Sequence, residues 1–209
     1  MYVPPQFKED RPEILAAAIR GAGLATLVTL GSDGIVATHA PMLLDAGPGP
    51  HGILVGHIAR ANPQWRDLVP GVRALAIFAG PDYYVTPSWY PAKQAHGRVV
   101  PTWNYVAVHA YGPIAFFDDA ERLHDVVRRL TEQQERPRAA PWAVSDAPAE
   151  YVSGMLKGIV GFAITVERLE GKWKVGQNRD EADRRGVAAG LAEEGRPDLA
   201  AIIPTGDPA

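Results

Sequence analysis

Hydrophobic positions recur with a helical period near the N-terminus and again past the middle of the chain. In residues 10–19, Asp10 and Glu13 have the spacing of a capping box, and apolar residues follow on one face. The same spacing recurs at Asp118 and Glu121. Four apolar residues then follow at i, i+3, i+4 and i+7: Leu123, Val126, Val127 and Leu130. We therefore expect an amphipathic helix in each segment.

Short apolar or alternating segments predict strands elsewhere. The expected strands cover residues 25–30, 35–44, 53–57, 73–78, 106–111, 159–169 and 172–176. Residues 31–34, with the sequence GSDG, predict a hairpin turn between the first two strands, and Glu170-Gly171 predicts a turn between the last two. The polar-rich segments 179–191 and 197–203 are predicted to be helical.

Loops and turns separate these segments. Asn62-Pro63 predicts a helical turn, and residues 45–50, rich in Gly and Pro, predict a surface loop. Residues 135–149, rich in Pro and Ala, predict a second loop, anchored by Trp142. Short strands outnumber helices and no regular strand–helix alternation is present. We therefore expect a single domain over residues 1–209 that is mainly β with peripheral helices, built as an antiparallel barrel.

Composition narrows the classes of function. The chain has 209 residues, no cysteine and a formal net charge of −3. Thiolate catalysis, disulfides and cysteine-ligated clusters are therefore excluded, and overall charge does not steer the protein toward nucleic acid. The N-terminus lacks the pattern of a secretory signal, and the longest uncharged run, residues 99–117, is interrupted by Pro101 and Pro113. We expect a cytoplasmic protein with no membrane segment.

The richest chemistry lies in residues 82–112. Two tryptophan-containing clusters, Ser88-Trp89-Tyr90 and Thr102-Trp103-Asn104-Tyr105, each follow a proline. A loop with Lys93, His96, Gly97 and Arg98 is expected between them. Aromatic faces beside hydroxyls, amides and cations suit a planar anionic ligand, for which a flavin phosphate is a good match. Packing of the aromatic residues in a core does not explain their polar neighbours.

Residues 57–62 lie where a strand gives way to a helical turn. Backbone N–H groups at a helix start favour anions, and an arginine there can bind a phosphate with two hydrogen bonds. We hypothesise that Arg60 and Asn62 hold a phosphate group. The alternative is that Asn62 caps the turn before Pro63 and that Arg60 is solvated.

Other motifs for common chemistries are missing. The six histidines have no HExxH or similar spacing, and no GxGxxG after a strand, GxSxG or P-loop is present. The basic pairs Arg128-Arg129 and Arg184-Arg185 and the residues Arg136 and Arg138 lie among acidic residues, and no helix-turn-helix signature is visible. The sequence therefore favours neither a metal site nor direct contact with DNA, although two histidines on neighbouring strands could still ligate haem or a metal.

The chain resembles the FMN-binding negative transcriptional regulators, the PaiB-like group. The matching stretches are collinear and cover nearly the whole chain: MYVP with Phe7, HIARANPQW (57–65), TPSWY (86–90) with Lys93, VPTWNY (100–105) with Val108-His109, KGIVGF (157–162) and QNR (177–179). Two departures are visible. Val175-Gly176 stands where the family has Leu-Ser, and Thr86 stands where the family favours Ser.

The resemblance implies a flavin-binding split β-barrel with FMN as cofactor, working as a homodimer with the flavin in a cleft between subunits. It also implies a repressor of transcription, with a possible DNA or regulatory partner. The residues that we expect at the cofactor are Thr38, His39, His57, Arg60, Asn62, Ser88, Trp89, Lys93, Trp103, Gln177 and Asn178.

Each of these assignments has an alternative. His39 and Thr38 suit a structural role on a strand, and both tryptophans suit a core or dimer interface. Lys93 suits a solvated loop, and the Gln177-Asn178 pair suits a turn and helix cap. The function also has alternatives: a flavin oxidoreductase that acts on a small electrophile, or a protein that stores or senses flavin or haem.

Overall fold

The computed structural model describes residues 1–206. The chain divides into two compact units: unit 1 comprises Met1–Arg11, Ala79–Val108 and Glu170–Ala209, and unit 2 comprises Pro12–Phe78 and His109–Leu169. The helices are α1 (Pro12–Gly21), α2 (Pro91–Ala95), α3 (Ala120–Glu135), α4 (Ala149–Leu156), α5 (Glu181–Glu193) and α6 (Pro197–Ala200). The expectation of a single domain stays a prediction.

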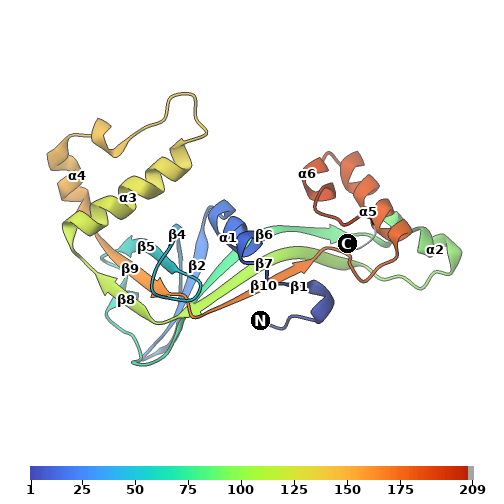
Figure 1. Cartoon of the computed structure of the whole chain (residues 1–209), viewed down its shortest axis with the longest axis horizontal. Helices are drawn as coiled ribbons and strands as arrows, with labels where there is room; N and C mark the ends of the chain where they lie inside the picture. The colour runs from blue at the N-terminus through green and yellow to red at the C-terminus, as the bar shows by residue number, and fades with distance from the viewer. Residues whose placement is uncertain (207–209) are drawn as a thin grey trace. The chain divides into compact units, whose positions relative to one another are not determined.

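Ten strands form two antiparallel sheets (Figure 1). The six-stranded sheet has the order β1-β10-β7-β6-β2-β3, and the four-stranded sheet has the order β4-β5-β9-β8. The strands are β1 (Lys8–Glu9), β2 (Ala25–Gly31), β3 (Gly34–Ala40), β4 (Met42–Asp45), β5 (Ile53–Ala59), β6 (Ala74–Val85), β7 (Thr102–Gly112), β8 (Ile114–Phe117), β9 (Ile159–Thr165) and β10 (Arg168–Lys174). The prediction of a mainly β fold with peripheral helices is confirmed.

In unit 2, α3 packs its apolar face on the four-stranded sheet. Val126 and Leu130 of α3 form a buried cluster with Leu43, Val55 and Ala163 of the sheet. Three residues of the predicted i, i+3, i+4, i+7 pattern, Leu123, Val126 and Leu130, are buried, and Val127 is half-buried. Figure 1 shows α3 as the yellow helix beside β5 and β9, and α4 as the orange helix next to α3.

The β2–β3 hairpin of unit 2 forms as predicted. Gly31 pairs with Gly34, which has a φ of 120°, a conformation that favours glycine. The carboxylate of Asp67 accepts hydrogen bonds from the Ser32 N–H, and a Cβ on Gly31 would lie 2.7 Å from Asp67 Oδ2. The hairpin tip is therefore held by a residue far along the chain, and Gly31 makes room for it.

In unit 1, helices α5 and α6 pack on the end of β6 and on the residues that follow it. A buried cluster joins Tyr83, Val85 and Tyr90 to Val187 and Leu191 of α5. The cluster also includes Leu199 and Ile203, which are near the end of the described chain. The predicted helix 179–191 corresponds to α5, which Asp180 caps by accepting a hydrogen bond from the Asp183 N–H at 2.8 Å. The predicted helix 197–203 corresponds to α6, which ends at Ala200.

Several predicted boundaries are wrong. The expected strand 35–44 is two strands in different sheets, β3 and β4, because Pro41 between them has no N–H for a ladder. The expected turn at Glu170-Gly171 lies inside β10, where Gly171 pairs with Glu9. The chain turns earlier, at Val166-Glu167, so the expected strand 159–169 ends at Thr165.

Three further predictions need correction. The cap of α3 is Asp119 rather than Asp118, and its carboxylate accepts from the Arg122 N–H at 2.8 Å. Trp142 does not anchor the 135–149 segment, because its side chain is exposed and Val144 is buried instead. The expected loop around Lys93 contains the short helix α2, and α4 was not predicted at all.

Candidate functional site

The candidate residues fall into two groups, one in each unit. Unit 2 holds Thr38, His39, His57, Arg60 and Asn62, and unit 1 holds Ser88, Trp89, Lys93, Trp103, Gln177 and Asn178. We describe each group by itself, starting with unit 2.

Asn62 caps the 3-10 turn Pro63–Trp65 and holds Thr38. Its Oδ1 accepts a hydrogen bond from the Gln64 N–H at 3.0 Å, and its Nδ2 donates to Thr38 Oγ1 at 2.8 Å. Both sides of the amide are therefore used within the protein. The structure brings Thr38 and Asn62 together and confirms the cap that the sequence offered as the alternative role of Asn62.

Gln64, the middle residue of this 3-10 turn, connects the turn to the β2–β3 hairpin. Its side chain is fully buried, and its Nε2 donates to Thr29 Oγ1 at 2.9 Å. Weaker contacts run to the Leu27 and Val36 carbonyls, both at 3.4 Å. Buried amides need such partners, so Gln64 stabilises the position of Asn62. The sequence analysis did not single out this residue.

Arg60 is oriented by the backbone at the start of β9. Its Nε donates to the Lys157 carbonyl at 2.8 Å, and its Nη2 donates to the Ile159 carbonyl at 3.1 Å. Nη1 lies 3.5 Å from Asp118 Oδ2, and the Arg60 carbonyl accepts from Trp65 Nε1 at 3.0 Å. Arg60 and Asn62, which the sequence placed at one phosphate, therefore have separate sets of partners.

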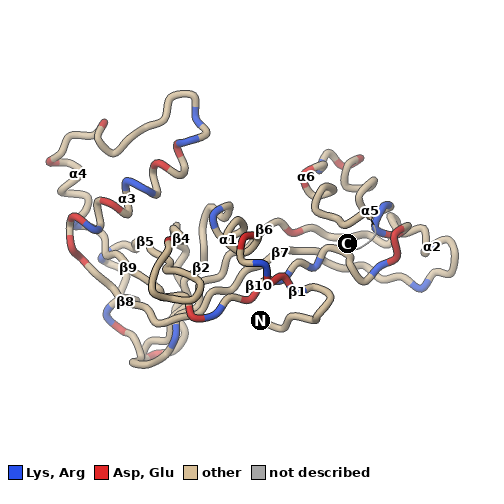
Figure 2. Tube along the Cα trace, in the orientation of Figure 1, with Lys and Arg blue, Asp and Glu red and all other residues tan. Residues whose placement is uncertain are grey.

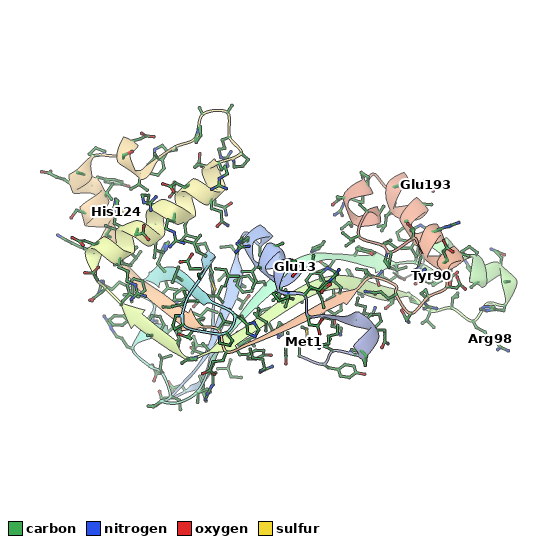
Figure 3. The ribbon with its side chains drawn as sticks, viewed as in Figure 1. Met1, Glu13, Tyr90, Arg98, His124 and Glu193 are labelled. Atoms are coloured by element: carbon green, nitrogen blue, oxygen red, sulfur yellow. The ribbon has the colours of Figure 1, made fainter. Side chains whose placement is uncertain are left out.

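The partly exposed Arg60 side chain lines a cavity of about 550 Å³ in unit 2. The cavity lies among α3, the 3-10 turn at Val144–Asp146 and α4, and its volume is in the range of small-molecule sites. The other lining residues are Asp118, Ala120, Leu123, His124, Val144, Ser145, Ala147, Ala149, Val152, Ser153, Leu156 and Lys157. Figure 3 shows His124 on α3. The sequence did not predict that the polar residues of this lining lie together, because no local pattern marks them as neighbours.

His57, on β5, faces a second cavity of about 250 Å³. Its Nδ1 is buried and has no hydrogen-bond partner among the described residues. Burial lowers the pKa of the His57 imidazole, since desolvation disfavours the charged form. His57 is therefore a neutral group with an unsatisfied nitrogen. His39, in contrast, is exposed, and its Nδ1 lies 3.1 Å from Thr26 Oγ1 on the adjacent strand.

In unit 1, Trp103 is an exposed aromatic side chain on β7. It is 56% exposed and meets Tyr84 of β6 edge to face, with ring centroids 5.9 Å apart. Lys174 donates to Thr102 Oγ1 at 2.7 Å and to the Trp103 carbonyl. Burial lowers the pKa of Lys174, and the charges of Lys172 and Arg179 add to the effect. The Trp103 face is thus available to a flat ligand beside a fixed cation.

Trp89 has a mainly structural setting. Its ring packs against the cluster formed with α5. A Cβ on Gly190 of α5 would collide with this ring, and one on Gly186 would collide with the Trp89 carbonyl oxygen. Ser88 is exposed and its Oγ accepts from Lys93 Nζ at 3.2 Å. Figure 3 labels Tyr90, which is buried at the end of this segment and has the Arg179 guanidinium 4.8 Å from its ring centroid. The structure thus brings Ser88 and Lys93 together.

Gln177 closes the turn after β10. Its Nε2 donates to the Trp173 carbonyl at 2.6 Å, and its Oε1 accepts from the Val175 N–H at 2.9 Å. The amide is therefore used locally, as the turn alternative predicts, while Asn178 is exposed. Gly176 has a φ of 93°, which favours glycine. The departure from the family's serine at this position thus matches the backbone conformation.

Within residues 1–206, no group of three or more His, Asp and Glu side chains is placed to hold a metal ion. In the same range, no helix is long and apolar enough to cross a membrane.

Comparison with known proteins identifies the family. Residues 1–168 match the family model described as "Putative FMN-binding domain". The chain belongs to this FMN-binding family. The matched range includes the candidate cofactor contacts from Thr38 to Trp103, whereas Gln177 and Asn178 lie beyond it.

Similar proteins and a solved structure match most of the length of this chain. It is 34% identical to the protease synthase and sporulation protein PAI 2 of Bacillus subtilis, with 94% of this chain and 92% of that protein covered. It is 36% identical to an uncharacterized protein of Emericella nidulans, with 93% and 92% covered. Its fold is similar to that of the FAD and heme binding protein from Mycobacterium smegmatis, with a TM-score of 0.57, 20% identity, and 88% and 80% covered.

Proposed function

We propose that this protein is a split-barrel flavoprotein that binds FMN as a homodimer, with the flavin between two subunits, and that it regulates transcription. The match of residues 1–168 to the FMN-binding family carries the proposal. Identity of 34% to PAI 2, a protein named for protease synthase and sporulation, supports the regulatory part. A cytoplasmic location remains part of this proposal.

Arg60 is the residue that we assign to the flavin phosphate. An arginine has five N–H donors, and the Lys157 and Ile159 carbonyls engage two of them. The third contact, to Asp118, is long at 3.5 Å and involves an exposed carboxylate. The two carbonyls hold the guanidinium in one orientation, and the remaining N–H groups suit a phosphate. Thr38, His39, His57, Asn62, Ser88, Trp89, Lys93, Trp103, Gln177 and Asn178 remain proposed neighbours of the cofactor.

Replacing Arg60 with alanine tests this assignment. Hydrogen bonds to a charged group contribute about 1.5–3 kcal/mol, so R60A should weaken FMN binding by about 10- to 150-fold. The measurement is a titration of apoprotein with FMN, followed by the flavin absorbance retained after gel filtration.

The matched control is Arg66→Ala. Arg66 lies six residues away and is exposed, with its guanidinium 4.4 Å from the centroid of the Trp65 ring. R66A should retain FMN like the unmodified protein. If R60A binds FMN as tightly as R66A does, Arg60 is not the phosphate contact. If the unmodified protein retains no flavin, FMN binding itself is refuted for this chain.

Charge placement bears on how a regulator would act. Figure 2 shows Lys and Arg interspersed with Asp and Glu along α3. There, Arg128 pairs with Asp125 and Glu132, both at 2.6 Å, and on α5 Arg185 pairs with Glu181. Paired charges of this kind make a poor electrostatic footprint for DNA. We therefore infer that regulation depends on a protein partner or on the flavin rather than on a broad basic face.

A mobility-shift assay and a turnover assay separate the functional classes. A DNA-binding regulator shifts a promoter fragment in a salt-dependent way. A flavin oxidoreductase instead oxidises NADPH or NADH faster when an electron acceptor is added. Turnover would replace the regulatory proposal with the enzymatic alternative, and a salt-dependent shift would contradict the inference that regulation does not use a broad basic face.

A further inference from the structure

Helix α4 is weakly packed for an element inside a compact unit. None of its residues is buried, and Tyr151 and Met155 are exposed. Its more sheltered apolar residues, Val152 and Leu156, line both cavities of unit 2. Because protein interiors are normally close-packed, an apolar helix face set over cavities of about 550 and 250 Å³ indicates space for another molecule.

The larger cavity has an apolar wall and a cationic rim. Leu123, Val144, Val152 and Leu156 supply the wall, together with three alanines. Lys157 is the exposed C-cap of α4 at the rim, and a cation is favoured at this end of the helix dipole. Within residues 1–206, no acidic side chain forms an ion pair with Lys157.

The other charged residues of the cavity lining do not neutralise the positive charge of Lys157. The lining includes one carboxylate, Asp118, which is 71% exposed and pairs with Arg60 at 3.5 Å. His124 of α3 and the hydroxyls of Ser145 and Ser153 add hydrogen-bonding groups that are not acidic. An occupant with an apolar body and one negative charge therefore complements the cavity, whereas a cation does not.

We propose that the cavity between α3 and α4 is a second ligand site that binds an apolar monocarboxylate, such as a medium-chain fatty acid. The hydrocarbon contacts Leu123, Val152 and Leu156, and the carboxylate pairs with Lys157. Apolar burial supplies most of the affinity, and the charge selects an acid over a base. Arg60, to which the flavin phosphate is assigned, also lines this cavity, but the proposed carboxylate contact is Lys157. The site would let a small organic acid act on the protein.

Titration calorimetry of the FMN-treated protein with decanoate tests the proposal, with decyltrimethylammonium as the probe of opposite charge. We expect decanoate to bind at one site per chain and the cationic probe to bind more weakly. Lys157→Glu should weaken decanoate binding by about three- to tenfold, because it removes one ion pair and adds a repulsion. It should also strengthen binding of the cationic probe. Lys8→Glu, which changes an exposed lysine in unit 1, should alter neither.

A second variant blocks the cavity without touching a charge. Ser153→Phe places a ring in the cavity lining from an exposed helix position and should reduce decanoate affinity about tenfold or more. Gly154→Phe is the matched control, because a Cβ on Gly154 meets nothing within 4 Å and Gly154 lines neither cavity. G154F should bind decanoate like the unmodified protein.

Three results would overturn the proposal: no decanoate binding, equal binding of the cationic probe, or equal effects of S153F and G154F. Loss of a dimer in S153F but not in G154F, seen by gel filtration with light scattering, would instead assign the cavity to a second copy of the chain. Retained flavin is measured in each sample. Failure of FMN binding with intact decanoate binding therefore refutes only the proposed function, and the reverse result refutes only this inference.

Discussion

Replacing Gly186 with alanine should destabilise the packing of α5 on the segment that carries Trp89. A Cβ at position 186 would lie nearer than 3.0 Å to the Trp89 carbonyl oxygen and 3.1 Å from Pro91 Cδ. Both obstacles belong to the backbone or to a proline ring, so α5 has to move. Overpacking of this kind costs about 1–3 kcal/mol.

The gain in helix propensity offsets part of this cost. Alanine is favoured over glycine inside a helix by about 1 kcal/mol. The net loss in free energy of unfolding is therefore up to about 2 kcal/mol, or up to about 8 °C in Tm for a chain of this size. Urea unfolding followed by circular dichroism, together with scanning calorimetry, measures both quantities.

Gly154→Ala is the control for G186A. It makes the same change inside α4, where the new Cβ meets nothing within 4 Å, so it should be neutral or stabilising by up to about 1 kcal/mol. If G186A is as stable as G154A, the close contact of α5 with Trp89 is not present. Trp89 would then be released from its structural role and become a stronger candidate for the flavin.

Two further predictions concern unit 2. Gln64→Leu should lower the free energy of unfolding by about 1–3 kcal/mol in urea titrations, because Thr29 Oγ1 would lose its buried donor; an unchanged midpoint would contradict this. The lowered pKa of His57 means that the unfolded chain binds the extra proton first as pH falls below about 6.5. Stability should therefore be fully present above that pH and decline below it, and His57→Gln should flatten this dependence. An identical pH profile for H57Q would exclude His57 as the cause.

Local patterns in the sequence were enough for much of the fold. The apolar spacing of α3, the GSDG turn of the β2–β3 hairpin and the Asn62-Pro63 turn all act over a few residues, and the structure has each of them. The predicted ends of helices and strands were less reliable. The shift of the α3 cap from Asp118 to Asp119 arose because two adjacent aspartates offer the same side-chain oxygen.

In the candidate site, too, the sequence predicted local features but not contacts between distant residues. The motif of residues 57–65 was recognisable in the sequence, and its cap at Asn62 followed from local chemistry. The partners of Arg60 did not follow from local chemistry, because the Lys157 and Ile159 carbonyls lie about a hundred residues further along the chain. A pairing at that separation depends on strand register, which local propensity does not encode.

The sequence by itself determined the class of fold, the family and the motif that carries the proposed phosphate contact, because these depend on periodicity and on residue types at fixed spacing. Only the tertiary structure decided that Pro41 separates two sheets and that Trp142 is exposed. It also brought Lys157, His124 and Leu123 to one cavity. Such contacts join distant residues through packing and strand pairing, whose energies exist only once the chain has folded.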